Sequence, residues 1–319
     1  MPSLIGIRAR PQARKRMPAM NREIQIDRPI FLVGSGRSGT TLLFRILAGH
    51  PGLTWFSNFS ARFPRYPQVA ILHRLYRTRQ RQPLPRPLAR LMPVPSEAYE
   101  IWDNCKPVVD SPYDPPLTRG DVGARDRDCI LRTISIHMAM QGGSRFIDKN
   151  TRNTRRIEYL NAIFPDALFI HIVRDPRAAA ASLLKVHWWP EMKVWCQEGV
   201  SPGEWSADGK DQAILAAILW REENRYILDR VGLLGDRYYR VHYEDLVSDP
   251  PRVLDSILKQ CDLNKNDRFD RFVARYPIRD MNYKYKNSLD DAQQNQIMNL
   301  AKPIIERLGY EYSMQKLAA

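Results

Sequence analysis

The chain has 319 residues, of which 44% are hydrophobic and 26% are charged, and 49 Lys and Arg against 35 Asp and Glu give it a net charge of +14. These proportions are typical of a globular protein and exclude a disordered, collagen-like or membrane-embedded chain. No apolar run approaches the roughly 18 residues that span a bilayer, and the first apolar stretch is too short for a signal-peptide core. We therefore expect a cytoplasmic protein without a transmembrane segment.

The positive charge is concentrated in two segments. Residues 1–28 contain seven Lys and Arg and two acids, and residues 60–96 contain eight Arg and no acid. We expect 1–28 to be a basic N-terminal arm, for which a transit-like peptide and an anionic-surface contact stay open as alternatives. Residues 29–319 are expected to form a single domain with irregular acceptor-side insertions near 60–123 and 188–210. Nucleic-acid binding is not expected because no recognition motif accompanies the charge, whereas peripheral membrane contact through the basic segments remains open.

The cysteines do not indicate a structural site. They lie far apart, without CxxC or His-flanked spacing, at Cys105, Cys129, Cys196 and Cys261. We expect neither a disulfide framework nor a zinc site, and a reducing compartment is the simplest reading.

Two parts of the chain repeat the order of buried strand, polar turn and helix. An apolar run at 29–33 ends at a glycine and precedes a helix at 42–47, and a second run at 167–173 precedes a helix at 178–184. Shorter strands are predicted at 144–147 and 238–241, and further helices near 69–77, 155–164, 211–230, 251–261 and 292–308. This alternation predicts an α/β fold with a parallel sheet flanked by helices.

The turn after the first strand, from Gly34 to Thr41, reads Gly-Ser-Gly-Arg-Ser-Gly-Thr-Thr. Its glycines let backbone N–H groups converge on an anion at the positive end of the following helix. An ordinary Walker A loop is disfavoured because Thr40 replaces its lysine. A dinucleotide loop is disfavoured because no acid lies between Asp27 and Glu97. The loop instead contains a cation, Arg37, that can contact the bridging or transferring oxygens of a nucleotide.

The stretch from Gly34 to Leu43 resembles the 5′-phosphosulfate loop of sulfotransferases that use 3′-phosphoadenosine-5′-phosphosulfate (PAPS), in the branch that writes it Arg-Ser-Gly-Thr-Thr. Arg174 and Ser182 resemble that family's 3′-phosphate pair, and the resemblance extends from about Pro29 to Tyr310. It implies the P-loop NTPase-like sulfotransferase fold. It also implies donor contacts from Gly36, Arg37, Ser38, Gly39, Thr40, Thr41, Arg174, Ser182, Tyr243, Lys284 and Lys286, with Lys149 beside the sulfonyl group.

The implied reaction is transfer of a sulfonate group from PAPS to a hydroxyl or amine, with release of 3′,5′-ADP and with no metal expected. Arg37 and Lys149 would neutralise the charge that develops on the bridging and sulfonyl oxygens. The glutamate that many relatives place after His-Pro is absent here, because no carboxylate follows His50-Pro51 closely. His187 is our candidate for the general base, with Asp148, His73 and His137 as others.

The acceptor stays open among small-molecule, lipid and carbohydrate classes. Four tryptophans within 18 residues, Trp188, Trp189, Trp195 and Trp205, predict either an acceptor platform or a lid that packs on itself. Two other functions are compatible with the loop, namely a nucleotide-dependent phosphotransferase and a non-catalytic nucleotide- or polyanion-binding module.

Overall fold

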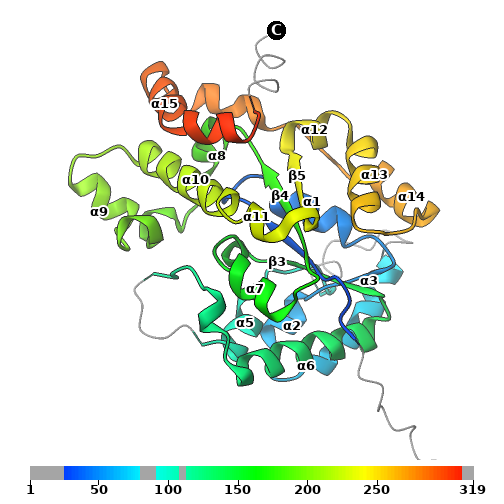
Figure 1. Cartoon of the computed structure of the whole chain (residues 1–319). Coiled ribbons are helices and arrows are strands. Elements are labelled where there is room, and N and C mark those ends of the chain that lie inside the picture. Colours follow the sequence, from blue (N-terminus) through cyan, green and yellow to red (C-terminus); the bar gives the residue numbers. More distant parts are fainter. Residues whose placement is uncertain (1–24, 80–90, 108–112, 311–319) are drawn as a thin grey trace, which may run out of the picture.

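The computed structural model describes residues 25–79, 91–107 and 113–310. Most of the predicted N-terminal arm therefore lies outside the described residues, as does part of the 60–123 insertion. In the described part of the chain, five parallel strands form one sheet in the order β2-β3-β1-β4-β5 (Figure 1). The strands are β1 (Ile30–Val33), β2 (Leu53–Thr54), β3 (Arg145–Lys149), β4 (Leu168–Val173) and β5 (Tyr238–His242). The predicted parallel α/β fold is confirmed.

The apolar strands are buried on both faces, as in other parallel sheets. In β1, Ile30 and Leu32 belong to one hydrophobic core, and Phe31 and Val33 belong to the core on the opposite face. Successive side chains point to opposite faces of a strand, so an uninterrupted apolar run supplies both cores.

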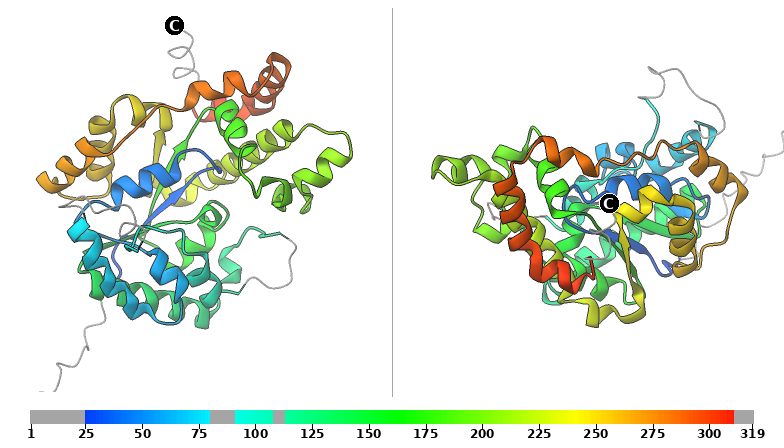
Figure 2. Two further views of the ribbon diagram at one scale, coloured as in Figure 1. Left: turned by 180° about the vertical axis from the view of Figure 1, so that it is seen from behind. Right: turned by 90° about the horizontal axis from the view of Figure 1, so that it is seen from above.

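Helices cover both faces of this sheet (Figures 1 and 2). They are α1 (Thr40–Leu47), α2 (Asn58–Arg62), α3 (His73–Arg79), α5 (Tyr99–Cys105), α6 (Ala124–Gln141), α7 (Ile157–Ile163), α8 (Pro176–Leu183), α9 (Pro202–Ala207), α10 (Gln212–Leu228), α11 (Val231–Leu234), α12 (Tyr243–Ser248), α13 (Pro250–Gln260), α14 (Asp267–Arg275) and α15 (Asp291–Arg307). The first core includes side chains of α1 and α13, and the second includes side chains of α5, α6 and α7. Across the described ranges, no helix is long and apolar enough to cross a bilayer.

The strand–turn–helix units occur where the sequence predicts them, whereas several helices were missed. The longest missed helix is α6, whose sequence mixes charged, β-branched and apolar residues and so gives a weak helical pattern. The stretches predicted to be irregular contain α5 and α9. The capping box of α9, formed by Ser201 and Glu204, is a start signal readable from the sequence. The predicted helix at 69–77 is a 3₁₀ turn, η1 (Pro67–Leu72), followed by α3.

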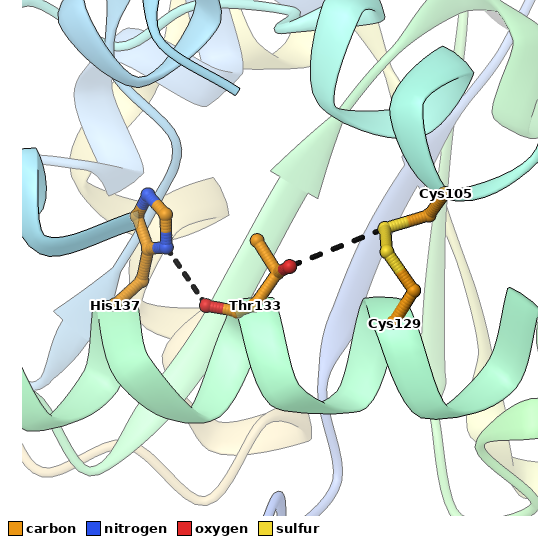
Figure 3. The surroundings of a disulfide bond; sticks show 4 residues. All are labelled: Cys105, Cys129, Thr133 and His137. Carbon is orange, nitrogen blue, oxygen red and sulfur yellow. Dashed lines mark hydrogen bonds between the residues drawn. A yellow bond between two sulfur atoms is a disulfide. The ribbon is translucent and has the colours of Figure 1, made fainter. Parts of the chain in front are cut away.

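Cys105 and Cys129 form a disulfide, so the expectation of no disulfide is wrong. Cys105 ends α5 and Cys129 lies in α6, and the two Cα atoms are 5.4 Å apart (Figure 3). Packing of α5 against α6 creates this proximity, which a separation of 24 residues in sequence could not reveal. Cys196 and Cys261 are free thiols.

Candidate active site

A cavity of about 1030 Å³ lies at the carboxyl ends of the strands, the edge where parallel α/β sheets bind ligands. β1 leads into the glycine-rich loop, β3 ends at Lys149, β4 leads into Arg174, and β5 leads into Tyr243. Ten of the predicted site residues line the cavity, namely Gly36, Arg37, Gly39, Thr40, Thr41, Lys149, Arg174, Ser182, Tyr243 and Lys284. Three others, Ser38, His187 and Lys286, are not among the described residues that line it.

The glycine-rich loop is shaped by tight contacts at some positions and by open space at another. Gly39 has φ +96°, and a Cβ at this position would lie 2.5 Å from Cδ2 of Tyr243. A Cβ on Gly36 would meet nothing within 4 Å. The hydroxyls of Thr40 and Thr41 make no hydrogen bond to any described residue and lie at the cavity wall. This side of the cavity therefore offers hydroxyl donors and free space to an anionic ligand.

The two predicted phosphate motifs contact each other directly. Nε of Arg37 donates to Oγ of Ser182 at 3.1 Å, and Nη1 of Arg174 donates to the carbonyl oxygen of Arg37 at 3.1 Å. The guanidinium of Arg174 also donates to Oδ1 of Asn282 at 2.7 Å and lies 4.4 Å above the ring of Tyr243. Burial, followed by the charge of Arg174, lowers the pKa of Arg37. Segments more than 130 residues apart thus form one cationic site.

A carboxylate that the sequence analysis did not select faces this cationic site. Glu97 forms an ion pair with Nζ of Lys149, and both residues line the cavity. The hydroxyl of Tyr99 donates to Oε2 of Glu97 at 2.6 Å and lies 2.5 Å from Oγ1 of Thr151. Nδ2 of Asn150 donates to the backbone oxygen of Glu97 at 2.8 Å. Lys149 and Tyr99 therefore hold the Glu97 side chain, and Asn150 holds its backbone.

The local backbone explains how Glu97 and Tyr99 both reach the cavity. Ala98, between them, has φ +45°, a left-handed conformation that is uncommon for a residue with a Cβ. The turn at Ala98 precedes α5, whose buried Ile101 and Trp102 fix it to the core. The only sequence signal for this site is that Glu97 is the first acid after Asp27.

None of the predicted base candidates is among the described residues that line the cavity. His187 is exposed, and His73 packs its ring on Trp55 at 4.6 Å. His137 hydrogen-bonds the Thr133 carbonyl at 2.8 Å and the Ser60 hydroxyl at 2.9 Å, and burial lowers its pKa to about 4.

Asp148 is fully buried and accepts from Nδ2 of Asn153 at 2.7 Å. Burial raises the pKa of Asp148 to about 7. Asp148, His73 and His137 are thus buried in structural surroundings, and His187 is exposed outside the cavity lining, so the choice of His187 as the base stays a prediction.

The remaining cavity wall is largely apolar and includes Leu42, Val186, Trp188, Met192, Pro277 and Met281. Of the four clustered tryptophans, Trp188 lines the cavity, whereas Trp189 is fully buried and Trp195 packs on Tyr226. Of the two predicted alternatives, an acceptor platform could use only the Trp188 ring at this cavity.

Residues 29–267 match the model of the sulfotransferase family, and the chain belongs to this family. Its predicted identity as a PAPS-dependent sulfotransferase is confirmed at this level, in preference to the phosphotransferase and the binding module. The chain is 26% identical over 313 residues to the omega-hydroxy-beta-dihydromenaquinone-9 sulfotransferase Stf3 of Mycobacterium bovis, and the alignment covers 89% of this chain and 76% of that protein. The protein of the same name from Mycobacterium tuberculosis gives the same values.

Solved sulfotransferase structures share the fold. STF9 from Mycobacterium avium has a TM-score of 0.55 at 18% identity, with 86% of this chain and 76% of that chain covered. STF1 from Mycobacterium tuberculosis H37Rv has a TM-score of 0.50 at 18% identity, with 88% and 77% covered.

Proposed function

We propose that the cavity holds PAPS between the two cationic motifs, with the 5′-phosphosulfate at the glycine-rich loop and the 3′-phosphate at Arg174 and Ser182. The observation that carries this proposal is the contact of Arg37 with Ser182 and Arg174, which joins both anion-binding motifs across one cavity. The open position of Gly36 and the Thr40 and Thr41 hydroxyls fit a ligand with anionic oxygens.

The other predicted donor residues take different roles in this proposal. Tyr243 would face the adenine, and Lys284 on η7 (Asn282–Asn287) would cover the nucleotide from the cavity wall. Ser38 would support the loop, because its hydroxyl is buried against Ser35 Oγ at 2.7 Å. Lys286 is exposed away from the cavity lining and could contribute only long-range charge. We also propose that residues 29–319 form one domain behind a basic arm.

We further propose that Glu97 is the general base in place of His187. It is the only acidic side chain among the described residues that line the cavity, and it contacts Lys149. The acceptor hydroxyl would lose its proton to Glu97 as its oxygen forms a bond to sulfur, and the bond from sulfur to the 5′-phosphate oxygen of 3′,5′-ADP would break. Arg37 and Lys149 would neutralise the charge that moves onto the leaving phosphate.

The acceptor that fits best is an apolar, lipid-like alcohol. The name of the Stf3 relatives describes an omega-hydroxylated dihydromenaquinone, which is a hydroxyl group on an apolar chain. In this chain the cavity lining also includes Leu42, Val186 and Met281 together with Trp188. An apolar wall next to a single carboxylate suits a ligand whose one polar end reacts.

The experiment compares Glu97→Gln with the control Glu100→Gln, which changes an exposed acid of α5 outside the cavity lining. With PAPS and a long-chain alcohol, we expect Glu97→Gln to lower kcat by about 10²–10⁴-fold. Stabilisation by 3′,5′-ADP over ATP in a thermal shift should persist in both variants, because Glu97 is not a donor contact. Full turnover in Glu97→Gln would refute the base, and equal stabilisation by ATP and 3′,5′-ADP would refute the donor site.

We propose the cytoplasm as the location of the protein, since its predicted co-substrate is a nucleotide. The Cys105–Cys129 disulfide weighs against a strongly reducing compartment. Thiol labelling of protein trapped in intact cells and then denatured tests the proposal, because four labelled cysteines would agree with a reducing compartment and two would contradict it.

A further inference from the structure

Residues 62–75 expose arginines and large apolar side chains within one short segment. Phe63 is 43% exposed, Tyr66 65%, Ile71 43% and Leu75 46%. Arg62, Arg65 and Arg74 are exposed between them. We call these seven residues the interfacial patch. Large apolar side chains gathered in this way on a surface mark a site of interaction more often than isolated ones do.

The segment that carries the patch is well packed on its inner side. Ala70, His73 and Tyr76 of the same segment are buried, and Tyr76 packs edge-on against Trp55 with ring centroids 4.9 Å apart. The inner side of η1 and α3 is therefore already fixed to the core. Ile71 and Leu75, one helical turn apart, lie on the outer side and contribute nothing to that core.

The charged side chains within the patch all have one sign. They are Arg62, Arg65 and Arg74, and no acid lies between residues 60 and 76. Arg62 and Arg65 form no ion pair with any carboxylate of the described residues, and Arg62 instead lies 5.9 Å from the ring of Phe63. The surface thus combines uncompensated guanidinium groups with apolar side chains that water solvates poorly.

We propose that the interfacial patch docks the protein on an anionic lipid bilayer. Arginines pair with lipid phosphates while aromatic and aliphatic side chains enter the boundary between headgroups and acyl chains. A nucleic acid would satisfy the arginines and could stack on Phe63 or Tyr66. It would leave Ile71 and Leu75 in water, so the aliphatic pair favours the bilayer.

The patch also lies on the face of the molecule that carries two of the cavity-lining elements. Both views of Figure 2 place the α2–α3 segment on the face seen from behind, which also carries α1 and η7. Leu42 of α1 and Lys284 of η7 line the cavity. We infer that docking through the patch brings these cavity-lining elements close to the membrane surface. The docking itself is independent of the proposed function, whereas delivery of a membrane-dissolved acceptor rests on it.

The test is cosedimentation of the full chain with vesicles of phosphatidylcholine alone and of phosphatidylcholine with phosphatidylglycerol. We expect binding to the anionic vesicles only, with an affinity that falls as salt is added. The triple variant Phe63→Ser, Ile71→Ser, Leu75→Ser should reduce the affinity at least tenfold. The charge variant Arg62→Gln, Arg65→Gln should also weaken binding, and the control Leu233→Ser, an exposed leucine of α11 outside the patch, should not.

Unchanged vesicle binding by the triple variant would overturn the proposal, and so would equal binding to neutral vesicles or stronger binding to single-stranded RNA at equal phosphate. Turnover of a water-soluble short-chain alcohol with PAPS should be the same in the triple variant and the wild type. A chain that binds vesicles through the patch but transfers no sulfonate would refute the proposed function and leave the docking surface standing.

Discussion

Gly36 and Gly39 occupy the same loop and serve different purposes. Gly39 combines a left-handed backbone with direct contact to Tyr243, so it accepts no side chain without movement. Gly36 has neither restriction, and its free space lies on the cavity side. The first glycine therefore preserves the cavity, whereas the second preserves the fold of the loop.

Alanine substitutions separate these two roles. We expect Gly39→Ala to lower the free energy of unfolding by about 1–3 kcal/mol, because the left-handed conformation and the contact with Tyr243 both oppose a Cβ. Gly36→Ala should leave thermal stability within about 0.5 kcal/mol of the wild type and raise the KM for PAPS. Thermal melts and donor titrations measure both effects. A Gly36→Ala protein with unchanged donor KM would show that the donor does not occupy this space.

Some residues of the candidate site could be predicted from the sequence, and others could not. Arg37, Arg174 and Ser182 were predicted because the strand–turn–helix units that contain them resemble the phosphate motifs of a known family. Glu97 was not, because it belongs to no such unit and reaches Lys149 only through the left-handed turn at Ala98. Its partner Tyr99 was missed for the same reason. A side chain placed by tertiary packing leaves no periodic signal in the sequence.

At the scale of elements, α5 connects the disulfide to the active site. It begins at Tyr99, which donates to Glu97, and ends at Cys105, which is bonded to α6. Arg152 strengthens the same region, since it lies 5.0 Å from the Tyr99 ring and pairs with Asp103 at 2.5 Å and Asp114 at 2.7 Å. The disulfide therefore restrains the helix that follows the carboxylate.

Removal of the disulfide should destabilise the protein without abolishing its fold. For a closed loop of this length, the entropy model gives about 3.5 kcal/mol for Cys105→Ser, Cys129→Ser. We expect a lower midpoint of chemical denaturation for this variant than for the control Cys196→Ser, which changes a thiol outside the disulfide. Equal midpoints would mean that packing of Trp102 and its neighbours alone holds α5.

The elements also differ in how clearly the sequence predicts them. β1 with α1, and β4 with α8, were predicted because an apolar run, a turn and a capped helix follow one another. By contrast, α5 and α6 were missed because their helical character depends on burial against the sheet and against each other. Long-range packing of this kind overrides weak local preferences.

At the scale of the whole molecule, buried ionisable groups make the stability of the fold depend on pH. Burial raises the pKa of Glu223 to about 7, although its carboxylate accepts the N–H of Gly36 at 3.1 Å and lies 3.4 Å from Nη1 of Arg155. Burial lowers the pKa of His171 to about 3. Stability linked to His171 is lost as the pH falls below about 6.5, where the unfolded histidine takes up a proton first.

Glu223 has the opposite effect on how stability changes with pH. Between its ordinary pKa of 4.5 and about 7, the folded protein holds a proton that the unfolded chain has released, so stability falls as the pH rises through this range. We expect Glu223→Gln to remove this fall, with a change of up to about 3 kcal/mol between pH 4.5 and pH 8 relative to the wild type. Denaturation midpoints measured across this range would contradict the assignment if the two profiles ran parallel.

The strand order affects how the protein folds during its synthesis. β1 is the central strand, and its neighbours β3 and β4 begin more than 110 residues later in the chain. During synthesis at about 5–20 residues per second, the first strand waits several seconds or more for partners on the ribosome. Its four apolar residues are exposed to solvent or to chaperones throughout that interval. Contacts so distant in sequence make the centre of the sheet slow to form, and the glycine-rich loop can take shape only after β4 has emerged.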